Sequence, residues 1–101
     1  MADNKQEIKS TSFDELVKIF TDINDEKFMK DFMECLFTPA EREDFANRWT
    51  LVKEIDKGTT QREIAKNFNM SLCKITRGSK ELSKEDSAFR KVLEMYKINK
   101  F

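Results

Sequence analysis

The sequence predicts an all-α protein, and three observations support this fold class. Only 2 Gly and 1 Pro occur among 101 residues, so few positions interrupt a helix. Apolar residues recur at helical spacing along most of the chain. Three Ser/Thr-x-x-Glu patterns, at Ser12, Thr38 and Thr60, each precede such an apolar series, which is typical of a capped helix start. We therefore expect a single domain of six helices joined by short loops.

The first two helices are expected to carry broad apolar surfaces. Residues 1–11 lack an apolar period, so we expect a flexible N-terminal arm followed by a domain over residues 12–101. The Ser12 box begins the first helix, which ends at Asn24-Asp25, and a second helix covers residues 28–36. These helices and the last one hold more bulky apolar side chains than so short a chain buries, which predicts a homodimer.

The third helix is expected to begin at Thr38, with Pro39 in the first turn, and to end at Gly58. The C-terminal helix is expected over about residues 84–98, from the spacing of four apolar residues: Phe89, Val92, Leu93 and Tyr96.

Residues 60–78 fit a helix-turn-helix unit, in which a second helix is presented to a DNA groove. Asn69 tolerates the left-handed backbone that the turn needs, and Met70 can pack between the two helices. Both helices carry apolar residues in matching register, namely Ile64, Ala65, Phe68, Leu72 and Ile75. An ordinary helical hairpin is the alternative.

Charge is distributed unevenly although the formal net charge is zero. Residues 1–46 contain 6 basic and 12 acidic side chains, whereas residues 47–101 contain 13 basic and 7 acidic ones. The basic half includes the helix-turn-helix unit, which favours a surface that meets phosphates over a merely solvated basic face.

Several other classes of function are disfavoured. The chain has no His, no activated nucleophile pair and no Gly-rich phosphate loop, so we do not expect an enzyme. Cys35 and Cys73 lack CxxC spacing and neighbouring His, which predicts reduced cysteines and no metal site. No apolar run approaches the roughly 20 residues of a membrane span, and residues 1–10 are too polar for a secretory signal. We expect a cytoplasmic protein without a membrane partner.

Particular motifs resemble the bacterial tryptophan repressor family over about residues 36–82. They are the FTPAERE string from Phe37, then Asn47-Arg48, Gln61-Arg62-Glu63 and the ITRGS string from Ile75. The resemblance implies an intertwined homodimer that acts as a transcriptional repressor. It also implies that double-stranded operator DNA is bound only with L-tryptophan, the corepressor, in a pocket beside each reading helix.

The resemblance also implies the ligand-binding residues, which are Cys35, Phe37, Thr38, Arg48, Arg77, Gly78 and Glu81. Arg77 would pair with the ligand carboxylate and cover one indole face, and Arg48 would stack on the other face. The carbonyls of Cys35 and Phe37 would accept from the ammonium, the Thr38 hydroxyl would meet the ligand, and Gly78 would leave room for the ring. Without the resemblance, the favoured interpretation is that the two arginines are surface residues and that Thr38 only caps a helix.

Two features depart from the family pattern. Glu81 stands where the family has a serine, so its carboxylate could strengthen ammonium binding or neutralise Arg77. The connection between Gly58 and Gln61 is one residue shorter, which could change the entry angle of the next helix.

For DNA, the resemblance points to Arg62 and four residues of the second helix, while Lys66 is a candidate phosphate contact. Lys74 can donate to guanine, and Leu72 and Cys73 offer apolar contact to a thymine methyl. The predicted DNA-binding set is Arg62, Lys66, Leu72, Cys73, Lys74 and Thr76.

Two other functions remain open from the sequence. One is a regulator of the same fold that binds a different ligand or none. The other is a helical protein-interaction adaptor that uses the apolar surface of the first two helices. The operator sequence and the regulated genes cannot be inferred from these residues.

Overall fold

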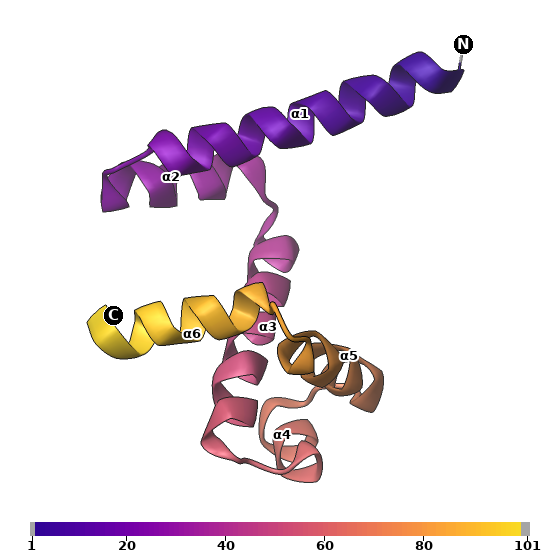
Figure 1. The fold of residues 1–101 in the computed structure, drawn as a ribbon, viewed down its shortest axis with the longest axis vertical. Coiled ribbons are helices and arrows are strands. Elements are labelled where there is room, and N and C mark those ends of the chain that lie inside the picture. Colours follow the sequence, from indigo (N-terminus) through magenta and orange to yellow (C-terminus); the bar gives the residue numbers. More distant parts are fainter. Residues whose placement is uncertain (1, 100–101) are drawn as a thin grey trace. The chain divides into compact units, whose positions relative to one another are not determined.

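The computed structural model describes residues 2–99 and contains six α-helices in that range (Figure 1). They are α1 (Ala2–Asp22), α2 (Glu26–Leu36), α3 (Pro39–Lys57), α4 (Gln61–Phe68), α5 (Leu72–Ser83) and α6 (Ala88–Asn99). The described residues include no strand, so the all-α prediction and the number of helices are confirmed. The chain divides into two compact units, residues 1–39 and residues 40–101.

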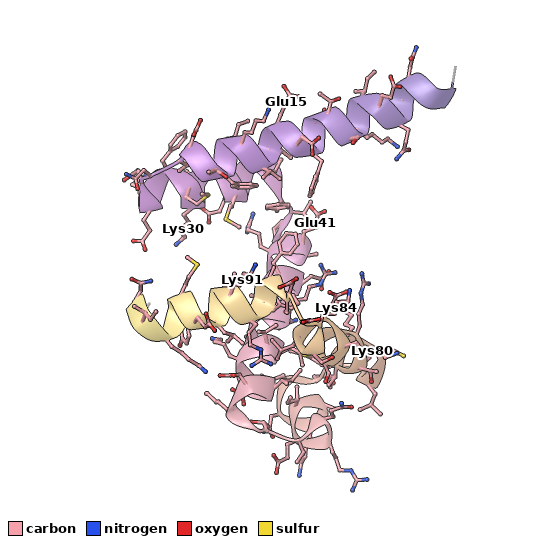
Figure 2. The ribbon with its side chains drawn as sticks, in the orientation of Figure 1. Glu15, Lys30, Glu41, Lys80, Lys84 and Lys91 are labelled. Atoms are coloured by element: carbon pink, nitrogen blue, oxygen red, sulfur yellow. The ribbon has the colours of Figure 1, made fainter. Side chains whose placement is uncertain are left out.

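The first unit contains α1 and α2, joined by a short turn after Asp22. The side chain of Asp25 accepts a hydrogen bond from the Phe28 amide at 2.9 Å and so caps α2. The rings of Phe20 and Phe32 bring the two helices together, with centroids 5.5 Å apart. Figure 2 shows charged side chains such as Glu15 standing out from the helix.

The predicted start of the first helix at Ser12 is wrong, because α1 already begins at Ala2. Residues 2–11 contain no Gly or Pro, and extending an existing helix costs far less than starting one. A polar segment can therefore continue a helix without any apolar period of its own, and Ser12 lies inside α1. The expected flexible arm is helical from Ala2 onward.

The second unit is built around α3, whose neighbouring residues Leu51 and Val52 point to different clusters. Leu51 packs with Ile64 of α4 and Ile75 of α5, and both of these isoleucines are 0% exposed. Val52 packs instead with two buried leucines, Leu82 of α5 and Leu93 of α6. Helix α3 therefore supports the two-helix unit on one side and the C-terminal helix on the other.

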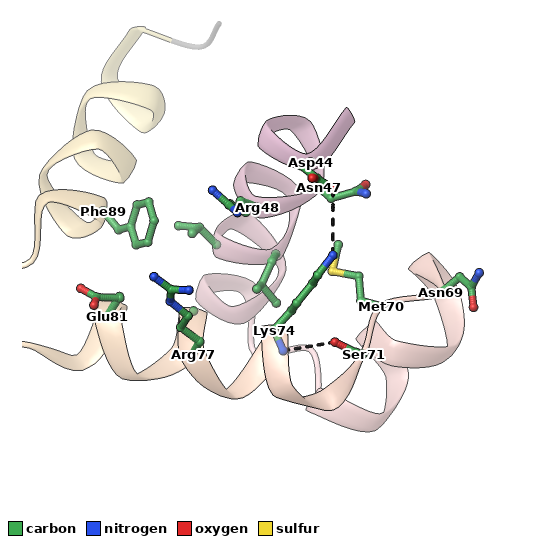
Figure 3. Close-up of a pocket in the computed structure, with 13 residues that line it drawn as sticks. Asp44, Asn47, Arg48, Asn69, Met70, Ser71, Lys74, Arg77, Glu81 and Phe89 are labelled. Atoms are coloured by element: carbon green, nitrogen blue, oxygen red, sulfur yellow. Dashed lines mark hydrogen bonds and ion pairs between the residues drawn. The ribbon is translucent and has the colours of Figure 1, made fainter. Parts of the chain in front are cut away.

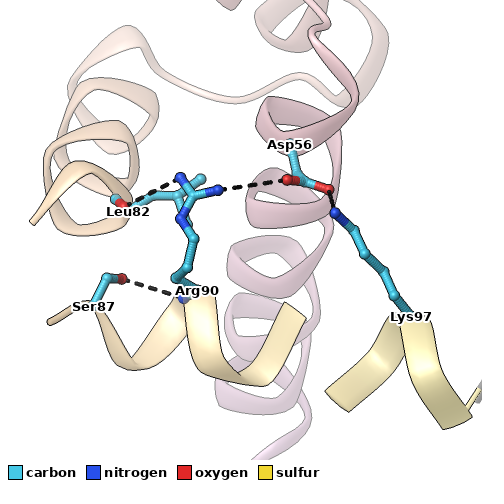
Figure 4. Close-up of polar contacts among 5 residues, drawn as sticks. All are labelled: Asp56, Leu82, Ser87, Arg90 and Lys97. Atoms are coloured by element: carbon cyan, nitrogen blue, oxygen red, sulfur yellow. Dashed lines mark hydrogen bonds and ion pairs between the residues drawn. The ribbon is translucent and has the colours of Figure 1, made fainter. Parts of the chain in front are cut away.

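Ion pairs also hold α6 against α3 (Figure 4). The Asp56 carboxylate lies 2.8 Å from Lys97 Nζ and 3.8 Å from an Arg90 guanidinium nitrogen. Arg90 in addition donates to the Leu82 carbonyl at 3.5 Å. The half-buried Asp56 carboxylate of α3 thus pairs with two cations of α6 and holds that helix against α3.

The boundary between the last two helices differs from the prediction. Helix α5 continues to Ser83, and α6 begins at Ala88 instead of near Lys84. The buried Ser87 hydroxyl accepts from the Arg90 amide at 3.3 Å, which makes Ser87 the cap of α6.

Candidate functional site

The two-helix unit of α4 and α5 begins with a complete capping box. The Thr60 hydroxyl accepts from the Glu63 amide at 3.2 Å, and the Glu63 carboxylate accepts from the Thr60 amide at 3.3 Å. Before it, Gly58 ends α3 with φ at 92°, a conformation that favours glycine. The capping box and the helix stop at Gly58 are both confirmed.

The turn between α4 and α5 has the conformation that the sequence predicts. Asn69 adopts φ 53° and ψ 43°, in the left-handed region, and Met70 packs against the Leu51 cluster. The Ser71 hydroxyl then caps α5 by accepting from the Lys74 amide at 3.3 Å. The Ser71 cap and the partly buried Met70 together hold the two helices at their turn.

One part of the predicted packing is wrong. Leu72 is 60% exposed and Phe68 is 39% exposed. Of the two α5 residues that were predicted to pack against α4, Ile75 is buried and Leu72 is not. Met70 precedes α5 and packs against this cluster, whereas Leu72 at the first position of α5 faces solvent.

The predicted DNA-binding residues of α4 and α5 are all exposed. Arg62 and Lys66 lie on α4, and the other four residues lie on α5: Leu72, Cys73, Lys74 and Thr76. Their exposure makes a basic and partly apolar surface available to a partner, and their role in DNA binding stays a prediction.

A pocket of about 600 Å³ lies beside this unit, between α3, the α4–α5 turn, α5 and the start of α6 (Figure 3). Four of the predicted ligand-binding residues line it. Arg48 comes from α3, and α5 supplies Arg77, Gly78 and Glu81. The structure thus brings together two arginines, a carboxylate and a glycine from distant parts of the sequence. Its volume lies in the range of about 300–1,000 Å³ that is typical of small-molecule sites.

Gly78 of α5 lies tightly against Leu51 of α3. A Cβ atom built on Gly78 would lie 2.6 Å from Leu51 Cδ2 and 3.3 Å from Leu51 Cγ. A side chain at this position would therefore have to displace a core residue of α3. The glycine serves the packing of the two helices as well as the space in the pocket.

The other three predicted ligand-binding residues lie at the end of α2 and in its link to α3. Cys35 is the penultimate residue of α2, and the Phe37 amide donates to the Met33 carbonyl at 2.9 Å, with Thr38 next along the chain. They belong to residues 1–39, which form a unit of their own, and their part in a ligand site stays a prediction.

The pocket lining includes two charged residues, Asp44 and Lys74, that were not predicted for it, and the predicted Glu81 has an ion-pair partner. Asp44 of α3 lines the pocket and lies 4.0 Å from Lys74 Nζ, while the Glu81 carboxylate lies 2.9 Å from Lys84 Nζ. Phe89 of α6 adds an aromatic wall. A sequence signal for Asp44 did exist, because it precedes Arg48 by four residues and so shares its helical face.

Within residues 2–99, no group of three or more acidic or Cys side chains is placed to hold a metal ion. Over the same range, none of the helices combines the length and the apolar character that crossing a membrane requires.

Comparison with known proteins identifies the family. Residues 11–97 match the family described as Trp repressor protein. A Trp operon repressor homolog of Chlamydia trachomatis serovar L2 is 37% identical over 70 residues, which cover 68% of this chain and 74% of that protein.

Two further relatives carry the same name. The homolog of Chlamydia caviae is 31% identical over 90 residues, covering 88% of this chain and 89% of its own. The homolog of Xylella fastidiosa strain M23 is 33% identical over 75 residues, which cover 73% of this chain and 82% of that protein. No solved structure gives a significant match. On these matches and on its six helices, the chain belongs to the Trp repressor family, a family of regulatory proteins.

Proposed function

We propose that the protein is a cytoplasmic transcriptional repressor whose homodimer binds operator DNA when L-tryptophan occupies the pocket between α3 and α5. The observation that carries this proposal is the position of Arg48 and Arg77. They come from different helices, line the same pocket, and lie directly beside a capped helix-turn-helix unit.

The lining residues suit an aromatic amino acid. A guanidinium group can bind a carboxylate through two parallel hydrogen bonds and can also stack flat on an indole ring. Arg77 is proposed to do both, and Arg48 to cover the opposite face of the ring. Arg48 already lies over an aromatic ring, that of Phe45, at 5.8 Å from the centroid.

The ammonium of the ligand needs acceptors. Glu81 supplies a carboxylate in the pocket, and the structure pairs this carboxylate with Lys84. Of the two roles that the sequence leaves open, ammonium binding is the one we propose for Glu81. The carbonyls of Cys35 and Phe37 and the Thr38 hydroxyl are proposed as further partners.

Ligand binding is proposed to affect DNA binding through helix α5, which lines the pocket and also carries predicted DNA contacts. Helix α5 lines the pocket with one face and carries Leu72, Cys73 and Thr76 on an exposed face. A ligand that fits one α3–α5 angle better than others shifts the population toward that angle by its difference in affinity. The two reading helices of a dimer are then held at a fixed spacing.

Exposed apolar side chains support the proposed dimer. Ile8 and Phe13 of α1 are 64% and 67% exposed, and Met95 and Ile98 of α6 are 54% and 79% exposed. Side chains of this size are normally buried, and a second copy of the chain can cover them.

Calorimetric titration with L-tryptophan tests the pocket without an operator sequence. We expect Arg77→Ala to weaken binding by about 1.5–3 kcal/mol, or about 10- to 150-fold, because it removes a charged hydrogen-bonded partner. Arg48→Ala should cost only about 0.5–1 kcal/mol, because it removes stacking alone. Arg62→Ala is the matched control, since this arginine of α4 is outside the pocket and should leave tryptophan binding unchanged.

Indole propionate, which lacks the ammonium, tests Glu81. If Glu81 binds the ammonium, Glu81→Ser weakens tryptophan binding and not indole propionate binding. If it neutralises Arg77, the variant binds both ligands more tightly. A folded wild-type dimer that gives no heat with L-tryptophan would favour a regulator with another ligand or none.

A further inference from the structure

An ion pair crosses the pocket at the end that lies nearest to the helix-turn-helix turn. Lys74 Nζ of α5 lies 4.0 Å from Asp44 Oδ1 of α3, and both residues line the pocket (Figure 3). The Lys74 side chain thus reaches across to α3, toward the side of the pocket from which Asp44 and Arg48 project.

This position conflicts with the role proposed for Lys74 on DNA. To donate to a guanine edge, the Lys74 ammonium would have to exchange the Asp44 carboxylate for the base. In the structure the ammonium is associated with a carboxylate instead. Asp44 and DNA therefore compete for one cation.

We propose that the Asp44–Lys74 ion pair is an intramolecular strap that holds Lys74 toward α3 and so competes with DNA for its ammonium. Both residues line the pocket, so a ligand that contacts either side chain would compete with the ion pair. This inference rests on the proposed function, because it assigns Asp44 as a positioning residue for a DNA contact.

The exposure of the pair sets the size of the effect. The Lys74 side chain is 67% exposed and that of Asp44 is 52% exposed, so water and salt screen their attraction. Ion pairs of this kind shift an equilibrium by about 1.4- to 5-fold. The strap is therefore a modest bias on ligand-free DNA binding, which a ligand can overcome.

A double-mutant cycle tests the strap directly. The probe is a duplex selected from a random pool by tryptophan-loaded wild-type protein, and its affinity is measured by fluorescence anisotropy without tryptophan at low salt. We expect Asp44→Asn to bind about 2- to 5-fold more tightly than wild type, because Lys74 is released. In a Lys74→Met background, the same substitution should change nothing.

Two controls separate the strap from a general effect of charge. Glu43→Gln removes a neighbouring exposed carboxylate of α3 that does not line the pocket, so it reports how any lost acid affects DNA binding. Asp44→Glu keeps the charge and should retain the wild-type affinity. The ratio of tryptophan-loaded to ligand-free affinity should fall in Asp44→Asn by the factor that the ligand-free form gains.

The outcomes are distinct. An equal gain in the Lys74→Met background, or an equal gain with Glu43→Gln, would overturn the strap while leaving the repressor function intact. A wild-type dimer that selects no duplex would overturn the repressor function, and the strap with it. Circular dichroism and sedimentation of each variant confirm that the affinities compare folded dimers.

Discussion

Replacing Gly78 by alanine has two opposing effects on stability. One is on the propensity of α5 to be helical, and the other is on the packing of α5 against α3. Gly78 lies inside α5, where alanine is favoured over glycine by about 1 kcal/mol. The new methyl group would, however, lie 2.6 Å from Leu51 Cδ2, and Leu51 is only 3% exposed. Forcing an extra carbon into a packed core costs about 1–3 kcal/mol. We therefore expect Gly78→Ala to change the free energy of unfolding by about 0–2 kcal/mol toward instability.

The assay is urea unfolding followed by circular dichroism at one fixed protein concentration, since a dimer's stability depends on concentration. Leu51→Val in the Gly78→Ala background should recover part of the loss, because the branched Cδ atoms that meet the methyl group are removed. In the wild-type background the same Leu51→Val change should only destabilise.

Gly58→Ala is the matched control, because it makes the same chemical change in a different setting. Nothing lies within 4 Å of a Cβ atom at Gly58, but the backbone there has φ at 92°. Its cost is therefore backbone strain, which Leu51→Val cannot relieve. If Gly78→Ala instead raised the free energy of unfolding by the full helix preference of about 1 kcal/mol, the contact with Leu51 would cost nothing. That result would refute the packing argument.

Three further predictions address the turn, the DNA surface and the dimer. Asn69→Ala should lower stability by about 1 kcal/mol relative to Asn69→Gly, because φ at 53° suits glycine and not alanine; equal melting temperatures would contradict this. Duplex affinity should fall steeply with salt, and Arg62→Ala should reduce the log-log slope by about 0.9 if that arginine contacts one phosphate, whereas a flat response of the wild type would count against DNA binding. Sedimentation at low micromolar concentration should show a dimer, and a compact folded monomer would contradict the role given to the exposed apolar residues of α1 and α6.

Local signals account for the parts of the fold that the sequence predicted well. The capping box at Thr60, the left-handed Asn69 and the helix stop at Gly58 each depend on a few neighbouring residues, and each is confirmed. Two errors concern helix ends. Helix α1 extends back to Ala2 through polar residues that have no apolar period. Helix α5 continues past residue 78 to Ser83, and its last turn carries Leu82, which packs with Val52 and Leu93.

The residues of the candidate site also fall into two groups, those that the sequence could identify and those that it could not. Its arginines, Gly78 and Glu81 could be named from the resemblance, because they stand in strings such as ITRGS that align by eye. The Asp44–Lys74 pair could not be named in this way. It depends on the distance between α3 and α5, which buried residues such as Leu51 and Ile75 set and which no local pattern encodes.

The charges around the pocket argue for a ligand that carries both signs. Arg48, Lys74 and Arg77 are balanced in the lining by only two carboxylates, Asp44 and Glu81. The lining therefore offers cations to a carboxylate and carboxylates to an ammonium, the two charged groups of an amino acid. Asp44 lies 4.0 Å from Lys74 Nζ and Glu81 lies 2.9 Å from Lys84 Nζ, so a ligand ammonium would displace or share an existing partner of either carboxylate. An amino acid that enters must exchange these exposed ion pairs for its own, and because exposed pairs are weak the exchange costs little. The same weakness lets Asp44 and Glu81 pair with lysines of α5 and its C-cap and still exchange them for a ligand.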